Sequence, residues 1–206
     1  HTCNTYLKSY GVNVADSVML IRGMAYDVNE IINEVGLPCF VKPNAEGSSF
    51  GVTKVKEAAQ LEDALKKAFA LCQEVLIETF IDGTELTCGV VKAGDMDIAM
   101  PIAEVIPKNE FFDFEAKYDP TKSDEIIPAR ISPELTNRIK TLSSMIYDIL
   151  RCEGIIRVDY IVRDDEIFML EVNTTPGMTS NSFVPKMVRA MGGTLREVLT
   201  KIIDNK

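Results

Sequence analysis

Histidine is almost absent from the 206-residue sequence, whose one histidine is its first residue, His1. Serine and cysteine nucleophiles commonly rely on a histidine as general base, and the rest of the chain offers none. Many classes of hydrolase and protease are therefore excluded.

A disulfide or zinc framework is also missing. The cysteines are odd in number, widely spaced and contain no C-x-x-C pair: Cys3, Cys39, Cys72, Cys88 and Cys152. This spacing predicts reduced, mostly buried thiols.

Positive charge and long apolar runs are scarce. The 22 Lys and Arg residues against 31 Asp and Glu residues give a formal net charge of −9, which argues against general nucleic-acid binding but leaves room for a local phosphate site. No run approaches the roughly 18 apolar residues that cross a bilayer, and no basic-then-apolar leader opens the sequence. We therefore expect a cytoplasmic protein with neither nucleic acid nor membrane as a partner. Because the first residue is His1 rather than Met, and residues 1–11 already have the pattern of a helix that ends at a glycine, we expect the chain to begin inside a larger protein.

The composition that remains, 46% hydrophobic and 26% charged, is sufficient for one large domain or two fused lobes. Strand and helix patterns alternate over the first third of the chain. Residues 74–107 then predict three strands of one antiparallel sheet, with turns at Asp82-Gly83 and Gly94-Asp95.

The last part of the chain begins with a long polar passage. Residues 108–130 have no clear period and predict a functional loop. Ser132, followed by proline, predicts the start of a helix. Two strands at 154–163 and 166–173 follow, and helical segments occupy the rest.

The two strands around Asp164-Asp165 allow a test of register. A regular two-residue loop would place Val158 opposite Glu171, mixing apolar with charged side chains, whereas a loop of odd length pairs Asp159 with Glu171. Only a loop of odd length places the apolar side chains of both strands together on one face. These side chains are Ile156, Val158, Tyr160, Val162, Phe168, Leu170 and Val172. We therefore expect an odd loop, with Met169 and Ile161 on the opposite, polar face.

That opposite face would gather Arg157, Asp159, Glu171 and Asn173. Two carboxylates and an amide are oxygen ligands suited to magnesium, and a neighbouring arginine suits a developing anion. The alternative is that these are polar residues on the solvated side of an ordinary hairpin. The apolar residues expected on the same face favour partial cover, and covered carboxylates need cations.

The stretch VKPNAEGSSFG places Lys42 at a strand end before a small, glycine-punctuated loop. Backbone N–H groups of such a loop can surround phosphate oxygens while the lysine neutralises them, although a plain hairpin turn fits equally well. It is not a Walker A loop, since the lysine precedes the glycines. Glu78 and Glu85 flank the Ile81-Asp82-Gly83 turn. By themselves they fit exposed strand ends, but together with a phosphate loop and a metal site they would suit the amine of a base and the hydroxyls of a ribose.

Taken together, the lysine loop, the glutamate pair and the D…E-x-N strands resemble the ATP-grasp enzymes. The segments KPNAEGSSFGV, EAKY, GIIRVDY and EVNTTPGMTSNSFVP are similar to those of D-alanine–D-alanine ligases. The resemblance implies an α+β, ATP-grasp fold of two α/β lobes with mainly antiparallel sheets enclosing a nucleotide site. It implies a central lobe at residues 1–85 and a C-terminal lobe at 86–206, with a lid at about 108–130.

The same resemblance implies a role for each site residue. Lys42 and Lys117 would contact the ATP phosphates, Glu78 the adenine and Glu85 the ribose. Two Mg²⁺ or Mn²⁺ ions would bind at Asp159, Glu171 and Asn173. Arg157 and the Gly177 N–H would form the oxyanion site, and Ser182 with the Phe183 backbone would bind the second D-alanine. Ser48 and Tyr118 would close over the site and orient the first.

The implied activity is ATP-dependent joining of two D-alanine molecules through an acyl phosphate, for peptidoglycan precursors, by an enzyme that is a homodimer when complete. Tyr118 favours an amine over the hydroxyl acceptor of D-lactate. Asn181 departs from the histidine common in the family, and we expect this departure to have only a mild effect. The family's first domain is absent, so we expect the fragment alone to be inactive. The alternatives are another ATP-grasp carboxylate–amine ligase, a non-catalytic ATP-binding module and a purely structural α/β domain.

Overall fold

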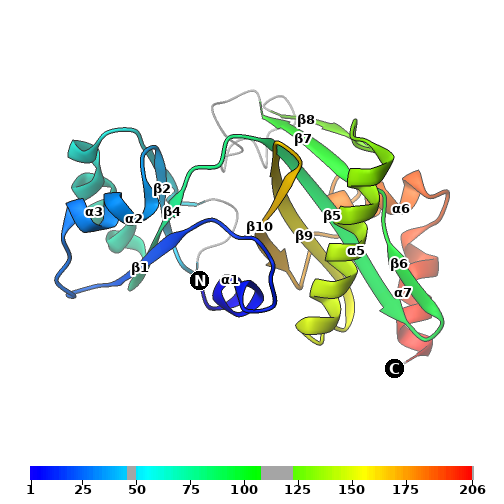
Figure 1. Ribbon diagram of the computed structural model, residues 1–206. Coiled ribbons are helices and arrows are strands. Elements are labelled where there is room, and N and C mark those ends of the chain that lie inside the picture. Colours follow the sequence, from blue (N-terminus) through cyan, green and yellow to red (C-terminus); the bar gives the residue numbers. More distant parts are fainter. Residues whose placement is uncertain (46–49, 108–122, 206) are drawn as a thin grey trace. The chain divides into compact units, whose positions relative to one another are not determined.

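A computed structural model describes residues 1–45, 50–107 and 123–205 (Figure 1). The chain forms two compact units, and it passes from the first to the second between Asp82 and Gly83. The first unit contains residues 14–82, and the second contains residues 83–106 and the chain from Glu125 onward. A short helix, α1 (Thr2–Lys8), has residues in each unit and buries Leu7.

The first unit contains a four-stranded sheet. Its strand order is β1 (Ser17–Ile21), β4 (Glu74–Thr79), β2 (Cys39–Pro43) and β3 (Thr53–Val55), and all neighbours are antiparallel. Side chains alternate along β2, where Cys39 and Val41 are fully buried and Lys42 lies on the other face. One sheet face therefore forms a core, and the other carries polar groups.

Two helices cover the apolar face of this sheet. They are α2 (Val28–Val35) and α3 (Leu61–Leu71), the latter preceded by the 3₁₀ turn η1 (Ala58–Gln60). The Asp27 side chain caps α2 by accepting from the Asn29 N–H at 2.7 Å, and Gly36 ends the helix with φ 71°. This backbone conformation favours glycine, which is why a glycine ends the helix.

The second unit contains a six-stranded sheet. The order is β10 (Glu166–Asn173), β9 (Gly154–Arg163), β5 (Thr84–Ala93), β7 (Ala103–Pro107) and β8 (Ser123–Ile126), and β6 (Met96–Ala99) also pairs with β5. The β10/β9, β9/β5, β5/β6 and β5/β7 pairs are antiparallel. The expectation of mainly antiparallel α+β architecture is therefore confirmed.

Helices pack on both faces of this second sheet. Helix α5 (Pro133–Ile149) lies on the face of Tyr160, whose hydroxyl is 2.7 Å from the Ser143 Oγ. Helices α6 (Phe183–Ala190) and α7 (Leu195–Asp204) pack on the opposite face (Figure 1). Gly89 of β5 lies on the α6 side, where a Cβ would come within 2.7 Å of the Met100 sulfur, so any other residue there would displace this methionine side chain.

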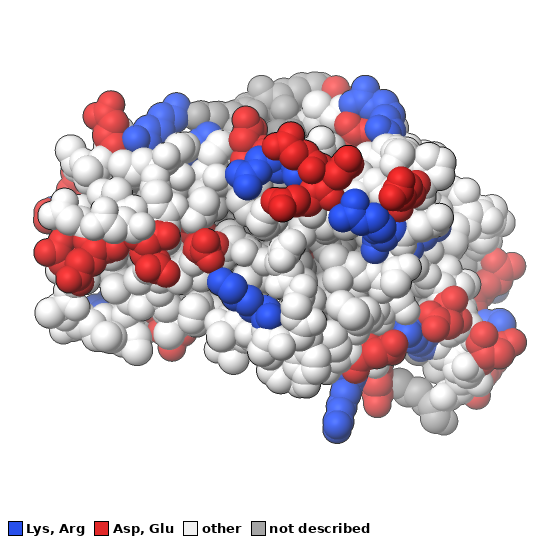
Figure 2. Space-filling model, viewed as in Figure 1, with Lys and Arg blue, Asp and Glu red and all other residues white. Residues whose placement is uncertain are grey.

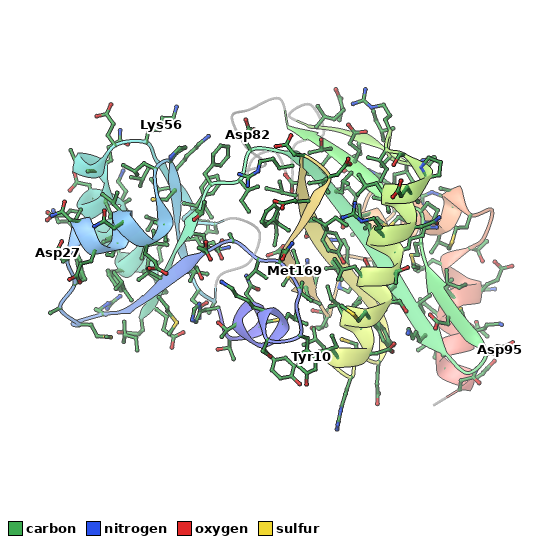
Figure 3. The ribbon with its side chains drawn as sticks, in the orientation of Figure 1. Tyr10, Asp27, Lys56, Asp82, Asp95 and Met169 are labelled. Carbon is green, nitrogen blue, oxygen red and sulfur yellow. The ribbon has the colours of Figure 1, made fainter. Side chains whose placement is uncertain are left out.

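The strand prediction for residues 74–107 was wrong in two respects. The segment forms four strands rather than three, and β4 belongs to the first unit's sheet. Asp82-Gly83 therefore connects two sheets, because no β4–β5 pairing exists among the described strands. Gly94-Asp95 does form the predicted hairpin turn, at Asp95 in Figure 3. The predicted loop 108–130 also contains β8 near its end.

The hairpin prediction was right about two pairs and wrong about the loop. Asp159 does oppose Glu171, and Arg157 opposes Asn173, but Glu166 pairs with Arg163 across a two-residue turn. Both turn residues, Asp164 and Asp165, have positive φ, which suits a tight hairpin. A β-bulge between Met169 and Glu171 supplies the shift that an odd loop was expected to provide.

The bulge also changes which apolar residues share a face. Met169, labelled on β10 in Figure 3, pairs with Tyr160 and is fully buried, so its expected place on the polar face was wrong. Phe168 instead pairs with Ile161, away from the apolar set to which it was assigned. Leu170 is the extra residue that the bulge accommodates.

All five cysteines are free, as expected, but the prediction that most are buried was wrong. Cys39 and Cys88 are buried, Cys72 and Cys152 are half-buried, and Cys3 is exposed. Burial raises the pKa of both Cys39 and Cys88 to about 11. These two thiols therefore remain protonated at neutral pH and serve as small core residues.

Candidate functional site

Four polar side chains from β9 and β10 meet on the α6 side of the second sheet. Arg157 donates through Nε and Nη2 to the two carboxylate oxygens of Asp159, both at 2.8 Å. The Asn173 Nδ2 donates to the Asp159 Oδ2 at 3.1 Å and to the Glu171 Oε1 at 3.3 Å. The predicted set is thus brought together, because antiparallel pairing aligns alternate residues of both strands on one face.

The electrostatics of this set centre on Arg157. Its side chain is only 15% exposed, and burial lowers its pKa, whereas the hydrogen bond and negative charge of Asp159 raise that pKa. The charges of Glu171 and Glu85 act in the same direction, so the pKa of Arg157 lies above its ordinary value. The guanidinium also lies over the Phe183 ring of α6, 5.5 Å from its centroid. Arg157 is therefore a fixed positive charge.

The donor set fits a magnesium or manganese ion. Asp159 and Glu171 are directly opposed carboxylates, and Asn173 offers an amide oxygen besides the nitrogen that faces them. The Glu171 side chain is 49% exposed, so solvent and ligand reach the set. Among the described residues no three His, Cys, Asp or Glu side chains cluster as a metal site. A site here consequently depends on the Asn173 amide as its third ligand.

A loop and helix start lie next to this set in the sequence. Ser182 precedes α6 at the N-cap position, yet its hydroxyl makes no capping hydrogen bond and instead lies 2.9 Å from the Thr179 Oγ1. At Gly177 a Cβ would come within 2.8 Å of the Ser182 Oγ, so glycine permits the approach. The Arg189 guanidinium donates to the Ser180 carbonyl at 2.7 Å and holds this loop on α6. Gly177, Ser182 and Phe183 are thus neighbours within one short segment.

In the first unit, Lys42 and Glu78 form an ion pair on the sheet face that the helices leave uncovered. The Lys42 Nζ is 2.5 Å from the Glu78 Oε2, with side chains 29% and 8% exposed. They come from the adjacent strands β2 and β4, where Phe40 opposes Glu78 and Leu76 opposes Lys42. A diagonal pair on one face results, and it places a cation beside a buried hydrogen-bond acceptor.

Of the four remaining predicted site residues, the structure describes only Glu85. Glu85 lies on β5 of the second unit, opposite Ile161, and its charge acts on Arg157. Ser48, Lys117 and Tyr118 lie outside the described residues.

The structure also identifies polar residues that the sequence did not single out. The Thr87 hydroxyl of β5 donates to the Asp159 Oδ1 at 2.5 Å. Buried Glu104 accepts from the Arg130 Nη2 at 2.6 Å and from the Arg130 backbone N–H at 3.1 Å. Because side chains alternate along a strand, the sequence could have placed Thr87 on the same face as Glu85. Its contact with Asp159 could not be predicted, because that contact depends on the pairing of β5 with β9, which are distant in the sequence.

Charge elsewhere on the surface is mixed. Figure 2 shows acidic and basic side chains interspersed over the face in view. Along the described stretches of the chain, no helix has both the length and the apolar character needed to cross a membrane.

Comparison with known proteins gives the fold class. The chain superimposes with a TM-score of 0.81 on the crystal structure of D-alanine–D-alanine ligase from Bacillus anthracis complexed with ATP, at 32% identity, covering 98% of this chain and 64% of that one. The VanG D-Ala:D-Ser ligase from Enterococcus faecalis gives a TM-score of 0.82 at 35% identity, covering 98% and 59%. The two antiparallel sheets therefore define an ATP-grasp ligase fold.

Sequence comparison gives the family. The family described as D-ala D-ala ligase C-terminus matches residues 6–204, and the chain belongs to it. The D-alanine–D-alanine ligase of Bacteroides fragilis is 55% identical over 205 residues, which cover 99% of this chain and 63% of that protein. The chain thus spans about 63% of the length of this curated relative.

Proposed function

We propose that the protein is an ATP-dependent ligase that joins two D-alanine molecules into D-alanyl-D-alanine. The observation that carries the proposal is the cluster of Arg157, Asp159, Glu171 and Asn173 on adjacent strands. It combines a metal-ligand set with a fixed arginine, the two features needed to neutralise phosphate and oxyanion charge.

Nucleotide binding is assigned to two lysines and two glutamates. Lys42 neutralises phosphate oxygens, while Glu78 accepts a hydrogen bond from the adenine amine and Glu85 accepts from the ribose hydroxyls. The Lys42–Glu78 ion pair supports the first two assignments, because each residue holds the other in place. Lys117 is a second phosphate-binding lysine in the proposal.

Divalent metal is assigned to Asp159, Glu171 and Asn173. When bound there, Mg²⁺ or Mn²⁺ would offset charge on the ATP phosphates. The protein's own contribution is to keep the three ligands on neighbouring strands, with Asp159 fixed by the Arg157 guanidinium at 2.8 Å. Because these side chains are already held in place, they need not rearrange when negative charge develops on the reacting groups.

The chemistry proceeds in two displacements. A carboxylate oxygen of the first D-alanine attacks the γ-phosphorus of ATP, the bond to the β-phosphate oxygen breaks, and ADP leaves. The amine of the second D-alanine then attacks the acyl carbon, loses a proton, and expels inorganic phosphate. Arg157 and the Gly177 N–H stabilise the oxyanion of the tetrahedral intermediate, and no histidine is required.

Acceptor binding is assigned to the start of α6. The Ser182 hydroxyl makes no capping bond to its own helix and can accept from the Thr179 hydroxyl, 2.9 Å away, while its own proton is donated to the acceptor carboxylate. The Phe183 N–H belongs to the first helical turn and is the second donor to that carboxylate. Ser48 and Tyr118 orient the first D-alanine. The match to a D-Ala:D-Ser ligase at 35% identity makes D-serine the second candidate acceptor.

Phosphate release tests this function. We would measure it with ATP, Mg²⁺ and D-alanine for this chain alone, and for this chain joined to the part of the Bacteroides fragilis relative outside the matched region. We expect the joined protein to release phosphate only when D-alanine is present, and the chain alone to be inactive. D-serine, D-lactate and L-alanine form the comparison panel, and faster release with D-serine than with D-alanine would reject the proposed acceptor.

A further inference from the structure

Thr87 contacts the proposed metal site from a third strand. It lies on β5 directly opposite Asp159 of β9, and its side chain is buried, with a relative exposure of 2%. Its hydroxyl is 2.5 Å from the Asp159 Oδ1 and 3.4 Å from the Val158 carbonyl oxygen. A hydroxyl has one proton to donate, and the shorter contact has the length of a charge-assisted bond to a carboxylate.

The contact distinguishes the two oxygens of Asp159. Strand β9 lies between β5 and β10, so Thr87 reaches Asp159 from the side opposite to Glu171 and Asn173. Thr87 bonds Oδ1, whereas the Asn173 amide bonds Oδ2. Of the two Asp159 oxygens, the Thr87 hydroxyl bonds only Oδ1, so it fixes the carboxylate with Oδ2 directed toward Asn173 of β10.

Threonine suits this task better than other hydroxyl residues. Its branched Cβ restricts χ1, so a buried threonine in a central strand loses little freedom on bonding the carboxylate. Arg157 bonds both Oδ1 and Oδ2, but through a long side chain that is assigned to an oxyanion as well. Thr87 therefore gives Asp159 a restraint that does not depend on the position of Arg157.

We propose that Thr87 is a positioning residue for the metal ligand Asp159. Its hydroxyl holds Oδ1 so that Oδ2 is presented to a cation shared with Glu171 and Asn173. The inference rests on the proposed function, because it presumes that this donor set binds a divalent ion. It assigns Thr87 no contact with substrate.

The test measures Mn²⁺ binding by the loss of the free-ion EPR signal, with a non-hydrolysable ATP analogue present. Thr87→Val keeps the side-chain shape and removes the hydroxyl, and we expect it to raise the apparent Kd for Mn²⁺ about tenfold, the lower end for residues that orient metal ligands. Thr87→Ser keeps the hydroxyl and should stay within about threefold of the unsubstituted protein.

Ser143→Ala provides the matched control. Ser143 is a fully buried hydroxyl in the same unit, bonded to the Tyr160 hydroxyl and the Ile139 carbonyl, so its loss costs stability without touching Asp159. We expect it to lower the unfolding temperature and leave the Mn²⁺ Kd unchanged. A merely structural Thr87 would behave in the same way.

Three outcomes overturn the inference, and they are distinguishable. A Thr87→Val protein that binds Mn²⁺ like the unsubstituted one removes the positioning role but leaves the proposed function standing. A tenfold loss of Mn²⁺ affinity in Thr87→Ser, which keeps the hydroxyl, assigns the effect to packing. If Thr87→Val does not fold, the Mn²⁺ affinity of Thr87→Ser decides whether the inference stands. Failure of the unsubstituted protein to bind Mn²⁺ with the nucleotide analogue removes the metal site and the inference together.

Discussion

The Arg157–Asp159 pair should be strongly coupled energetically. The two side chains are 15% and 13% exposed and share two hydrogen bonds of 2.8 Å. Removing one partner of a buried ion pair costs about 3–5 kcal/mol because the other charge remains buried and unpaired. Since both groups keep some contact with solvent, we expect Asp159→Asn to lower the free energy of unfolding by about 3 kcal/mol, the lower end of that range.

A double-mutant cycle separates this coupling from other effects. We would compare Asp159→Asn, Arg157→Met and the double variant by urea unfolding followed by circular dichroism, since the chain has no tryptophan. The double variant should be more stable than the sum of the single losses predicts, by about 2–3 kcal/mol. Additive losses would refute the reasoning, because they would mean that solvent screens the pair.

Three further predictions concern charge, burial and acceptor choice. The hydrogen bond from Arg130 holds the pKa of Glu104 below its ordinary value. At pH values above the unfolded-state pKa of about 4.3, the pair therefore contributes its full stabilisation to the fold. This stabilisation is lost as the pH falls through the pKa of Glu104 in the folded protein. Arg130→Gln should therefore lower the urea midpoint at pH 7 and match the unsubstituted protein in acid; an equal difference at both pH values would contradict this. Because the pKa of both Cys39 and Cys88 is about 11 and both are buried, iodoacetamide at pH 8 should leave them unmodified until urea unfolds the chain; labelling of the native protein at the rate of an exposed thiol would count against their burial. Tyr118→Phe in the complete enzyme should raise the share of D-lactate product, and an unchanged product ratio would remove Tyr118 from acceptor selection.

The hairpin illustrates what sequence alone could predict. A strand has a side-chain period of two, so sorting apolar from polar residues was enough to pair Asp159 with Glu171. The same sorting is satisfied by an extra residue in the loop or by one within the strand. The sequence offers no way to choose between them, and the choice moved Met169 into the core.

Contacts between distant strands were beyond local reasoning. Lys42 and Glu78 were both predicted to bind nucleotide, but their ion pair depends on the pairing of β2 with β4. Thr87 was missed because its partner Asp159 is 72 residues away in the chain. Asp82-Gly83 has the composition of a hairpin turn, yet it joins two sheets, since turn composition does not specify which strands pair.

Transfer of labelled oxygen tests the proposed ligase chemistry most directly. D-alanine carrying ¹⁸O in its carboxylate would be incubated with ATP, Mg²⁺ and the complete enzyme, and the released phosphate would be examined by ³¹P NMR. Attack of the carboxylate on the γ-phosphorus predicts one ¹⁸O atom in each phosphate released with dipeptide formation. Unlabelled phosphate accompanying the dipeptide would contradict an acyl-phosphate intermediate and, with it, the proposed mechanism.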